Sequence, residues 1–177
     1  RCEGRRLTGY NTDVTGLRAS LETFLGGERP ERALVLGTGG ASQAVQYVLA
    51  QMEIPFDLVS RNPATGNYTY DEVSDEVSGS HRIIINASPV GMHPNVEEAP
   101  RIPYAFVTPS HYLFDLIYNP AETLFLQYGA QRGAHTCNGL DMLVGQAEAA
   151  WAIWNHTGIS TALIAAGFIS VDFVLRT

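Results

Sequence analysis

A glycine-rich turn between an apolar run and a helical pattern limits the folds open to this chain more than any other feature. The run Ala33–Leu36 leads into Gly-Thr-Gly-Gly-Ala-Ser at residues 37–42, after which apolar residues recur at helical spacing. Glycines let a backbone turn tightly and approach a phosphate, and the following helix offers free N–H groups and the positive end of its dipole. This order of strand, turn and helix suits the pyrophosphate of a dinucleotide and therefore predicts a nucleotide cofactor.

The end of the next predicted strand bears on which dinucleotide binds. A protein that prefers NAD carries an acid there for the ribose 2′-hydroxyl, whereas this chain has Ser60 followed by Arg61. Arginine suits a 2′-phosphate instead, so the sequence favours NADP.

Strands alternate with helices along the chain. The predicted strands are Ala33–Leu36, Phe56–Ser60, Arg82–Asn86, Tyr112–Leu116 and Ala134–Asn138. Helices are predicted before the first strand, where Val14, Leu17, Leu21, Phe24 and Leu25 recur at helical spacing, and at residues 41–52, 120–131 and 141–155. This alternation predicts an α/β fold, Rossmann-like and doubly wound, with a mainly parallel sheet and helices on both faces.

Other stretches are assigned from composition and periodicity. Residues 62–80 are polar and turn-rich, with a short helix near residues 70–77, and the proline-rich stretch 89–110 is predicted to be a surface loop. In the last helix the residues expected to pack inwards are Leu143, Ala147, Ala150, Trp151 and Trp154. Residues 1–155 are expected to form one nucleotide-binding domain and residues 156–177 a tail of unknown role, in which alternating apolar residues suggest a strand.

Loops that follow parallel strands should meet at one crevice. The segments in question are Gly37–Ser42, Ser60–Asn62, Asn86–Met92, Asp115–Pro120 and Asn138–Asp141. All of them hold small or polar residues suited to contacting a ligand. Five such segments support the prediction of a ligand site more strongly than the glycine turn alone does.

Composition excludes several other classes of protein. A formal net charge of −7 gives no basic stripe for nucleic acid, and the five histidines form no cluster with metal-ligand spacing. Cys2 and Cys137 are predicted to be reduced thiols. The apolar stretch Ile159–Leu175 is too short for a membrane span, and no signal-peptide pattern is present. We therefore expect a cytoplasmic protein with neither a metal ion nor a membrane partner.

Five motifs together resemble those of shikimate dehydrogenases, the NADP-dependent enzymes that reduce 3-dehydroshikimate. They are Gly-Tyr-Asn-Thr-Asp at 9–13, Gly-Thr-Gly-Gly-Ala-Ser at 37–42, Asn-Ala-Ser-Pro-Val-Gly-Met at 86–92, Asp-Leu-Ile-Tyr-Asn-Pro at 115–120 and Asn-Gly-Leu-Asp-Met-Leu-Val-Gly-Gln-Ala at 138–147. They stand in the family's order, and the form resembles the compact bacterial version of the enzyme. The combination is far more specific than any single motif.

The resemblance implies a role for several residues. Asp13 matches the catalytic aspartate, which pairs with a lysine to move a proton, and Tyr118 and Gln146 match positions that contact the substrate. Gly139 and Met142 match residues that line the nicotinamide pocket. The full set assigned to the cofactor NADP is Gly37, Gly39, Gly40, Ala41, Ser42, Ser60, Arg61, Asn86, Ser88, Leu116, Gly139 and Met142.

The chain departs from the family pattern in two respects. Family members usually have Asn-Arg-Thr and then a second base where this chain has Ser60-Arg61-Asn62-Pro63. The family also has an N-terminal domain that carries the catalytic lysine and binds the substrate, whereas all 11 basic residues here are arginine. We therefore expect a fragment that lacks the N-terminal domain and is inactive alone.

Alternative functions remain open at this point. One is a quinate/shikimate dehydrogenase that uses NAD, and another is a nucleotide- or metabolite-sensing module that kept the fold without the chemistry. The partners expected of the favoured enzyme are shikimate or 3-dehydroshikimate and the absent N-terminal domain, and a homodimer is considered as well.

Overall fold

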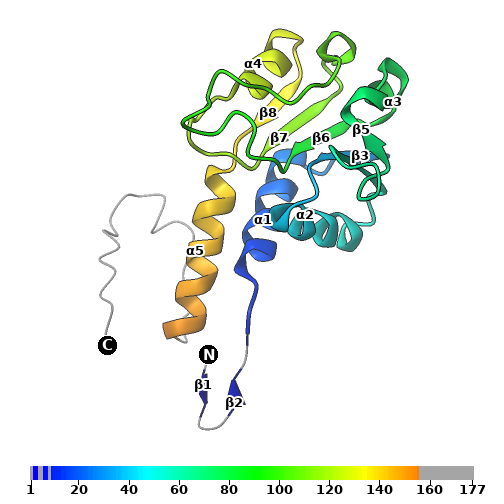
Figure 1. Ribbon diagram of the computed structural model, residues 1–177. Coiled ribbons are helices and arrows are strands. Elements are labelled where there is room, and N and C mark those ends of the chain that lie inside the picture. Colours follow the sequence, from blue (N-terminus) through cyan, green and yellow to red (C-terminus); the bar gives the residue numbers. More distant parts are fainter. Residues whose placement is uncertain (1, 4–5, 8, 156–177) are drawn as a thin grey trace.

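A sheet of six parallel strands forms the centre of the structure, a computed structural model that describes residues 2–3, 6–7 and 9–155 (Figure 1). The strands are β3 (Ala33–Leu36), β4 (Phe56–Ser60), β5 (Tyr68–Thr69), β6 (Ile83–Asn86), β7 (Tyr112–Asp115) and β8 (His135–Cys137). They lie in the order β5-β4-β3-β6-β7-β8, and every pair is parallel. Strand order reverses between β3 and β6, as it does in the Rossmann fold, so the predicted fold class is confirmed.

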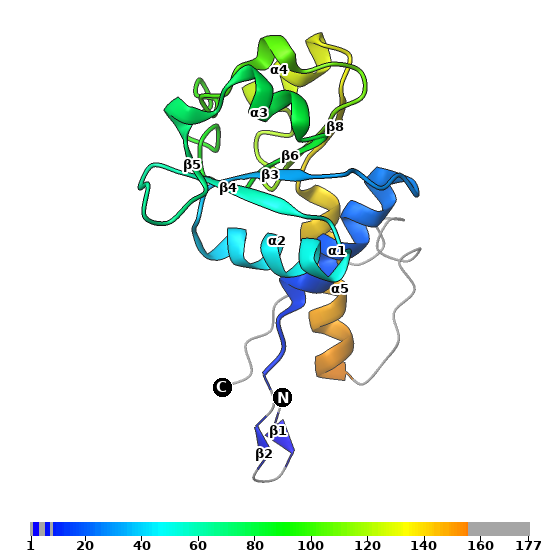
Figure 2. The same cartoon turned by 90° about the vertical axis from the view of Figure 1, so that its right-hand side faces the viewer.

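Helices cover both faces of this sheet. They are α1 (Thr12–Leu25), α2 (Gly40–Gln51), α3 (Asp75–Ser80), α4 (Leu124–Gln131) and α5 (Leu140–Asn155), with short 3-10 turns η1 (Tyr70–Glu72) and η2 (Tyr104–Phe106). Figure 2 shows α1, α2 and α5 on one side of the sheet and α3 and α4 on the other. Two short strands apart from the sheet, β1 (Cys2–Glu3) and β2 (Arg6–Leu7), pair antiparallel.

Successive strand residues enter two separate apolar layers. Val35 and Ile85 pack in the layer that contains Leu17 of α1 and Val45 of α2. Their neighbours along the strands, Leu34 and Ile84, enter the layer that contains Phe125 of α4. All seven side chains are completely buried. Because helices cover both faces of the sheet, these strands are apolar on both sides. Their sequences therefore show continuous apolar runs and no alternation of polar and apolar residues.

The region between β4 and β6 differs from its prediction. Within residues 62–80, which we expected to hold turns and one short helix, the chain adds a sixth strand at Tyr68–Thr69 and then forms η1 and α3. The strand was missed because a pair of residues carries no periodicity. The helix α4 also begins at Leu124, four residues later than expected, because the Thr123 hydroxyl accepts the Leu126 N–H and caps it there.

Helices α1 and α5 approach each other very closely. A Cβ built on Gly16 would lie 2.6 Å from the backbone nitrogen of Gln146 and would also collide with the Met142 carbonyl oxygen. On the other helix, a Cβ on Gly145 would lie 3.1 Å from the Cα of Gly16. The two glycines therefore allow backbone-to-backbone packing and fix where one helix crosses the other.

The end of α5 contradicts the inward packing expected of it. Trp151 and Trp154 are 43% and 63% exposed, and Ala147 is exposed as well. No residue of α5 is fully buried. The helical periodicity was real, but this end of the helix extends past the sheet (Figure 1), so part of its apolar surface has no cover in the described residues.

The predicted tail at residues 156–177, with its expected strand, lies outside the described residues. Of the helices that are described, none has the length and apolar character that crossing a membrane would require.

A buried ionic cluster lies near the amino ends of the strands. The carboxylate of Asp57 accepts hydrogen bonds from Nε of Arg32 at 2.7 Å and Nε2 of His81 at 2.9 Å. Asp57 and His81 are only 6% and 2% exposed. Burial alone would raise the pKa of Asp57, but these hydrogen bonds and the positive charge of the donors outweigh it and lower the pKa.

Replacing Asp57 by asparagine should therefore destabilise the fold in a pH-dependent way. A carboxyl whose pKa is lower in the folded chain stabilises it above the unfolded value, near pH 4, and loses that contribution as the pH falls further. We expect Asp57→Asn to lower the free energy of unfolding by about 1–3 kcal/mol at pH 6 and by less at pH 3. Urea titrations of the variant and of Asp71→Asn, an exposed acid, measure this; an equal loss at both pH values contradicts the prediction.

Candidate functional site

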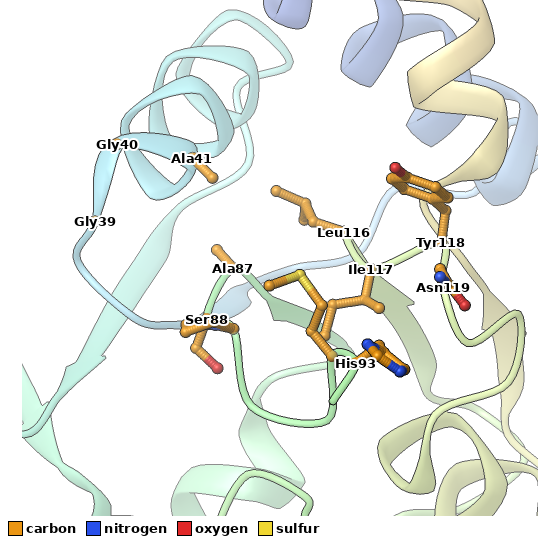
Figure 3. A pocket seen from close by; sticks show the side chains of 12 residues that line it. Gly39, Gly40, Ala41, Ala87, Ser88, His93, Leu116, Ile117, Tyr118 and Asn119 are labelled. Atoms are coloured by element: carbon orange, nitrogen blue, oxygen red, sulfur yellow. The ribbon is translucent and has the colours of Figure 1, made fainter. Parts of the chain in front are cut away.

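A cleft of about 530 Å³ opens at the carboxyl ends of β3, β6 and β7, where the strand order reverses. One wall is the glycine turn at residues 39–41, and the opposite wall is the segment 116–119 after β7 (Figure 3). Residues 87–89, after β6, lie between these walls, and residues 92–93 complete the lining. The lining comes from three of the five predicted segments, so their convergence is confirmed. Open parallel sheets bind ligands in this crevice.

The glycine turn leaves room for an anion. Gly37 has a φ of +107°, and a Cβ on it would lie 3.2 Å from the carbonyl oxygen of Ala87, so a side chain does not fit there. A Cβ on Gly39 or Gly40, in contrast, would meet no described atom within 4 Å. No side chain of the described residues caps α2 at Gly39. Within the described part of the chain, the first N–H groups of α2 thus have no side-chain acceptor at the glycine turn that lines the cleft, as a phosphate site requires.

Two predicted cofactor residues use their hydroxyl groups inside the protein. Ser42 is completely buried, and its Oγ accepts a hydrogen bond of 3.2 Å from Gln46. Ser60 is also buried, with its Oγ 3.3 Å from the Thr38 hydroxyl and 2.8 Å from the Thr65 hydroxyl. Both serine hydroxyls therefore stabilise the protein's own loops. Arg61, which follows Ser60, has an exposed side chain that can donate hydrogen bonds to a ligand.

Arg61 lies close enough to Tyr70 for its charge to act on that side chain. Burial raises the pKa of Tyr70, while a hydrogen bond with Ser88 and the positive charge of Arg61 lower it in part. Ser88 itself lines the cleft. The positive charge of Arg61, the residue predicted to bind a 2′-phosphate, therefore acts on Tyr70, a neighbour of the cleft residue Ser88.

Asn86, another predicted cofactor residue, lies beneath the cleft and is completely buried. Its amide nitrogen donates to the Val90 carbonyl oxygen at 3.2 Å and to Oδ1 of Asp115 at 3.1 Å. Its amide oxygen accepts the N–H of Ser88 at 3.1 Å and the hydroxyl of Ser88 at 2.7 Å. With its amide fully used in this way, Asn86 holds the loop of the cleft in place.

Asp115 ends β7, beneath the cleft, and within the segment 115–120 it was assigned no role of its own from the sequence. It is 0% exposed; Oδ1 accepts the N–H of Ile117 at 3.0 Å, and Oδ2 accepts the hydroxyl of Thr123 at 2.6 Å. Burial raises the pKa of Asp115 to about 6, although hydrogen bonds from Thr123, Ile117 and Asn86 lower it in part. An acid directly after three buried apolar strand residues was the signal available in the sequence.

Gly139 joins the far wall of the cleft to α5. Its N–H donates to the Ile117 carbonyl oxygen at 3.1 Å, and a Cβ on it would collide with the Leu116 carbonyl oxygen. Leu116 lines the cleft, and Met142 follows one turn into α5, packed against the first apolar layer. The structure thus brings Leu116 and Gly139 into direct contact.

The predicted catalytic residue lies where α1 meets α5. Asn11 caps α1 by accepting the Asp13 N–H at 3.1 Å, and the Asp13 side chain is exposed. The neighbouring Thr12 hydroxyl donates to Oε1 of Gln146 at 3.4 Å. Tyr118 is 51% exposed at the end of the cleft nearest α5 (Figure 3). Thr12 therefore joins the start of α1 to Gln146, and the roles of Asp13, Gln146 and Tyr118 stay predictions.

Comparisons with known proteins agree with this geometry. No family model matches the chain. It is 37% identical over 163 residues to a shikimate dehydrogenase (NADP(+)) of Caldanaerobacter subterraneus subsp. tengcongensis, a match covering 84% of this chain and 58% of that protein. It is also similar to the crystal structure of a chorismate mutase/shikimate 5-dehydrogenase fusion protein from Clostridium acetobutylicum, with 34% identity, a TM-score of 0.76 and coverage of 89% and 60%. A shikimate dehydrogenase in complex with NADP+ matches with 30% identity, a TM-score of 0.72 and coverage of 88% and 59%.

The chain spans about 60% of the length of these proteins. Over that span it shares their fold and about a third of their residues. By sequence and by structure, this chain belongs to the shikimate dehydrogenase family.

Proposed function

We propose that the chain is the NADP(H)-binding part of a shikimate dehydrogenase, which reduces 3-dehydroshikimate to shikimate with NADPH in the shikimate pathway of aromatic amino acid biosynthesis. The observation that carries this proposal is the cleft at the strand reversal, where uncapped N–H groups of α2 and the open space at Gly39 and Gly40 suit a pyrophosphate. A relative in complex with NADP+ supports the choice of coenzyme.

Different residues of the chain would bind different parts of the coenzyme. The glycine turn at residues 37–41 would bind the pyrophosphate, and the exposed Arg61 would bind the 2′-phosphate. Leu116, Gly139 and Met142 would border the nicotinamide, which supplies the hydride when the coenzyme is bound.

Proton transfer falls to Asp13 and to a lysine that this chain does not contain. Asp13 stands in the first turn of α1, where the helix dipole favours its carboxylate. There it would hold the lysine beside the reacting oxygen, so that the pair acts as general acid. Gln146, tied to the same turn through Thr12, and Tyr118 would contact the substrate.

The rest of the enzyme would supply that lysine together with the substrate site. We propose that this N-terminal domain packs against the projecting end of α5, where Trp151 and Trp154 are exposed. An NADPH-dependent biosynthetic step is consistent with the cytoplasm as its location, and the homodimer considered from the sequence stays a prediction.

The purified chain should bind NADP+ and oxidise no shikimate, because the coenzyme residues lie within it and the lysine does not. Calorimetry measures NADP+ binding. The rise in absorbance at 340 nm as NADPH forms measures turnover. Gly39→Val should abolish binding yet keep the melting temperature within a few degrees, since Gly39 has φ −80° and faces open space. Gly79→Ala, which also faces open space but lies in α3, is the matched control. Turnover by the chain alone contradicts this assignment.

Arg61→Ala should discriminate between the two dinucleotides. Loss of a charged donor to the 2′-phosphate should weaken NADP+ binding by about 1.5–3 kcal/mol and leave NAD+ binding nearly unchanged. Arg29→Ala removes another exposed arginine and serves as control. Equal losses for both coenzymes would assign Arg61 to the fold and favour the alternative enzyme that uses NAD.

Asp13→Asn in the full-length enzyme should separate catalysis from helix capping. The variant keeps the shape of the side chain, so the free energy of unfolding should change by less than about 1 kcal/mol. Turnover should fall by roughly 10²–10⁴, the usual contribution of a positioned acid or base. Asp75→Asn changes an acid in the first turn of α3 and controls for the helix dipole. Undiminished turnover would mean that Asp13 only supports α1 and that the catalytic assignment is wrong.

A further inference from the structure

A set of hydrogen bonds beneath the cleft converges on one buried acid. We propose that Asp115 is a positioning residue for coenzyme binding, which holds the 86–92 and 116–119 loops of the cleft through Asn86 and the Ile117 amide. The inference rests on the proposed function, because it takes a dinucleotide as the occupant of the cleft.

The first loop depends on Asp115 through Asn86. The Asn86 amide nitrogen donates to both Asp115 and the Val90 carbonyl oxygen, so one planar group fixes the carboxylate and the loop together. The amide oxygen of Asn86 then holds both the N–H and the hydroxyl of Ser88, which lines the cleft. Ser88 therefore carries the network from Asp115 to the lining of the cleft.

The second loop depends on Asp115 directly. Its Oδ1 accepts the Ile117 N–H at 3.0 Å, which turns the chain out of β7 and into the cleft wall. The Ile117 carbonyl oxygen in turn accepts the N–H of Gly139, at the start of α5. One carboxylate oxygen therefore serves both loops, at 3.0 Å to Ile117 and 3.1 Å to Asn86.

The surroundings of Asp115 determine which group changes charge. Asn86 from β6 and Thr123 from the start of α4 are neutral donors. Tyr104 from η2 faces Asp115, and burial followed by the negative charge of Asp115 raises the pKa of Tyr104. Among residues 9–155, no salt bridge from an arginine or histidine reaches Asp115. Asp115 is therefore the group in this network that takes up a proton on mild acidification, with a pKa of about 6.

Protonation would disturb the loops because every partner donates to the carboxylate. The N–H of Ile117 and the amide of Asn86 cannot reverse their direction, so a proton on Asp115 requires the Thr123 hydroxyl to turn and accept it. A neutral carboxyl is also a weaker acceptor for the two remaining donors. Both loops should therefore be held less firmly below pH 6.

Titration of the chain without coenzyme tests the positioning claim. In ¹H–¹⁵N spectra the Ile117 backbone amide and the Asn86 side-chain amide should shift together, with a midpoint near pH 6. In Asp115→Asn, which can keep all three hydrogen bonds, neither should titrate there. Asp71→Asn, an exposed acid, should leave both curves unchanged. Persistence of the shifts in Asp115→Asn, or their absence from the wild-type chain, overturns the inference.

Calorimetric titration with NADP+ then tests the consequence for binding. Between pH 7.5 and 5.5 the wild-type dissociation constant should rise by roughly three- to tenfold more than that of Asp115→Asn, which corresponds to the loss of about one hydrogen bond. The 2′-phosphate of NADP+ also takes up a proton in this pH range. The coenzyme and every other group of the cleft, including His93, are the same in both titrations, so the pH dependence that does not come from Asp115 is the part that Asp115→Asn retains.

The outcomes separate this inference from the proposed function. Binding with the same pH profile in both proteins overturns the role of Asp115 alone. Absence of NADP+ binding at every pH, with the Ile117 amide titrating as expected, overturns the proposed function and the coenzyme role with it. Should Asp115→Asn fold poorly, Thr123→Val must raise the midpoint of the Ile117 titration while Thr123→Ser does not, and an unchanged midpoint overturns the inference.

Discussion

Burial of the central strands on both faces is the constraint on which the other features depend. Strands β3, β6 and β7 are buried along their whole length, so helices must cover the sheet above and below. A polar ligand can then approach only the ends of the strands. At the reversal between β3 and β6 the connections leave in opposite directions, to α2 on one face and to the 87–110 segment on the other, and the cleft is the gap between them.

Two buried carboxylates at opposite ends of this sheet show how surroundings decide the behaviour of the same group. Asp57, near the amino ends, receives hydrogen bonds from Arg32 and His81, and its pKa is lowered. Asp115, at the carboxyl end of β7, is held by neutral donors, and burial raises its pKa to about 6. The first arrangement suits a fixed structural contact. The second leaves a charge that responds to pH directly beneath a ligand site, where such a response can affect binding.

The sequence was sufficient wherever one local pattern determined the structure. The run Ala33–Leu36, the glycine turn after it and the helix that holds Val14 to Leu25 all lie where they were predicted, because each depends on its own few residues. The residues around the cleft were only partly predictable. Nothing local distinguishes Ser60 and Asn86, whose polar groups are used inside the protein, from Arg61, which stays exposed. Asp115 was missed because its partners come from β6 and α4, which are distant in the sequence.

The exposed end of α5 has a different origin. Periodicity marks one face of a helix as apolar, but it does not say which neighbour covers that face. Near its start α5 meets α1, and the contact of Gly16 with Gly145 draws the two backbones so close that the helices cannot slide along each other. This fixed crossing carries the last turns of α5 beyond the sheet with Trp151 and Trp154 uncovered. The same crossing places Thr12, the residue before Asp13, against Gln146 of α5. In the proposed enzyme, a domain that docks on the projecting end of α5 would therefore contact the helix that also positions the start of α1, without any change in the nucleotide-binding sheet.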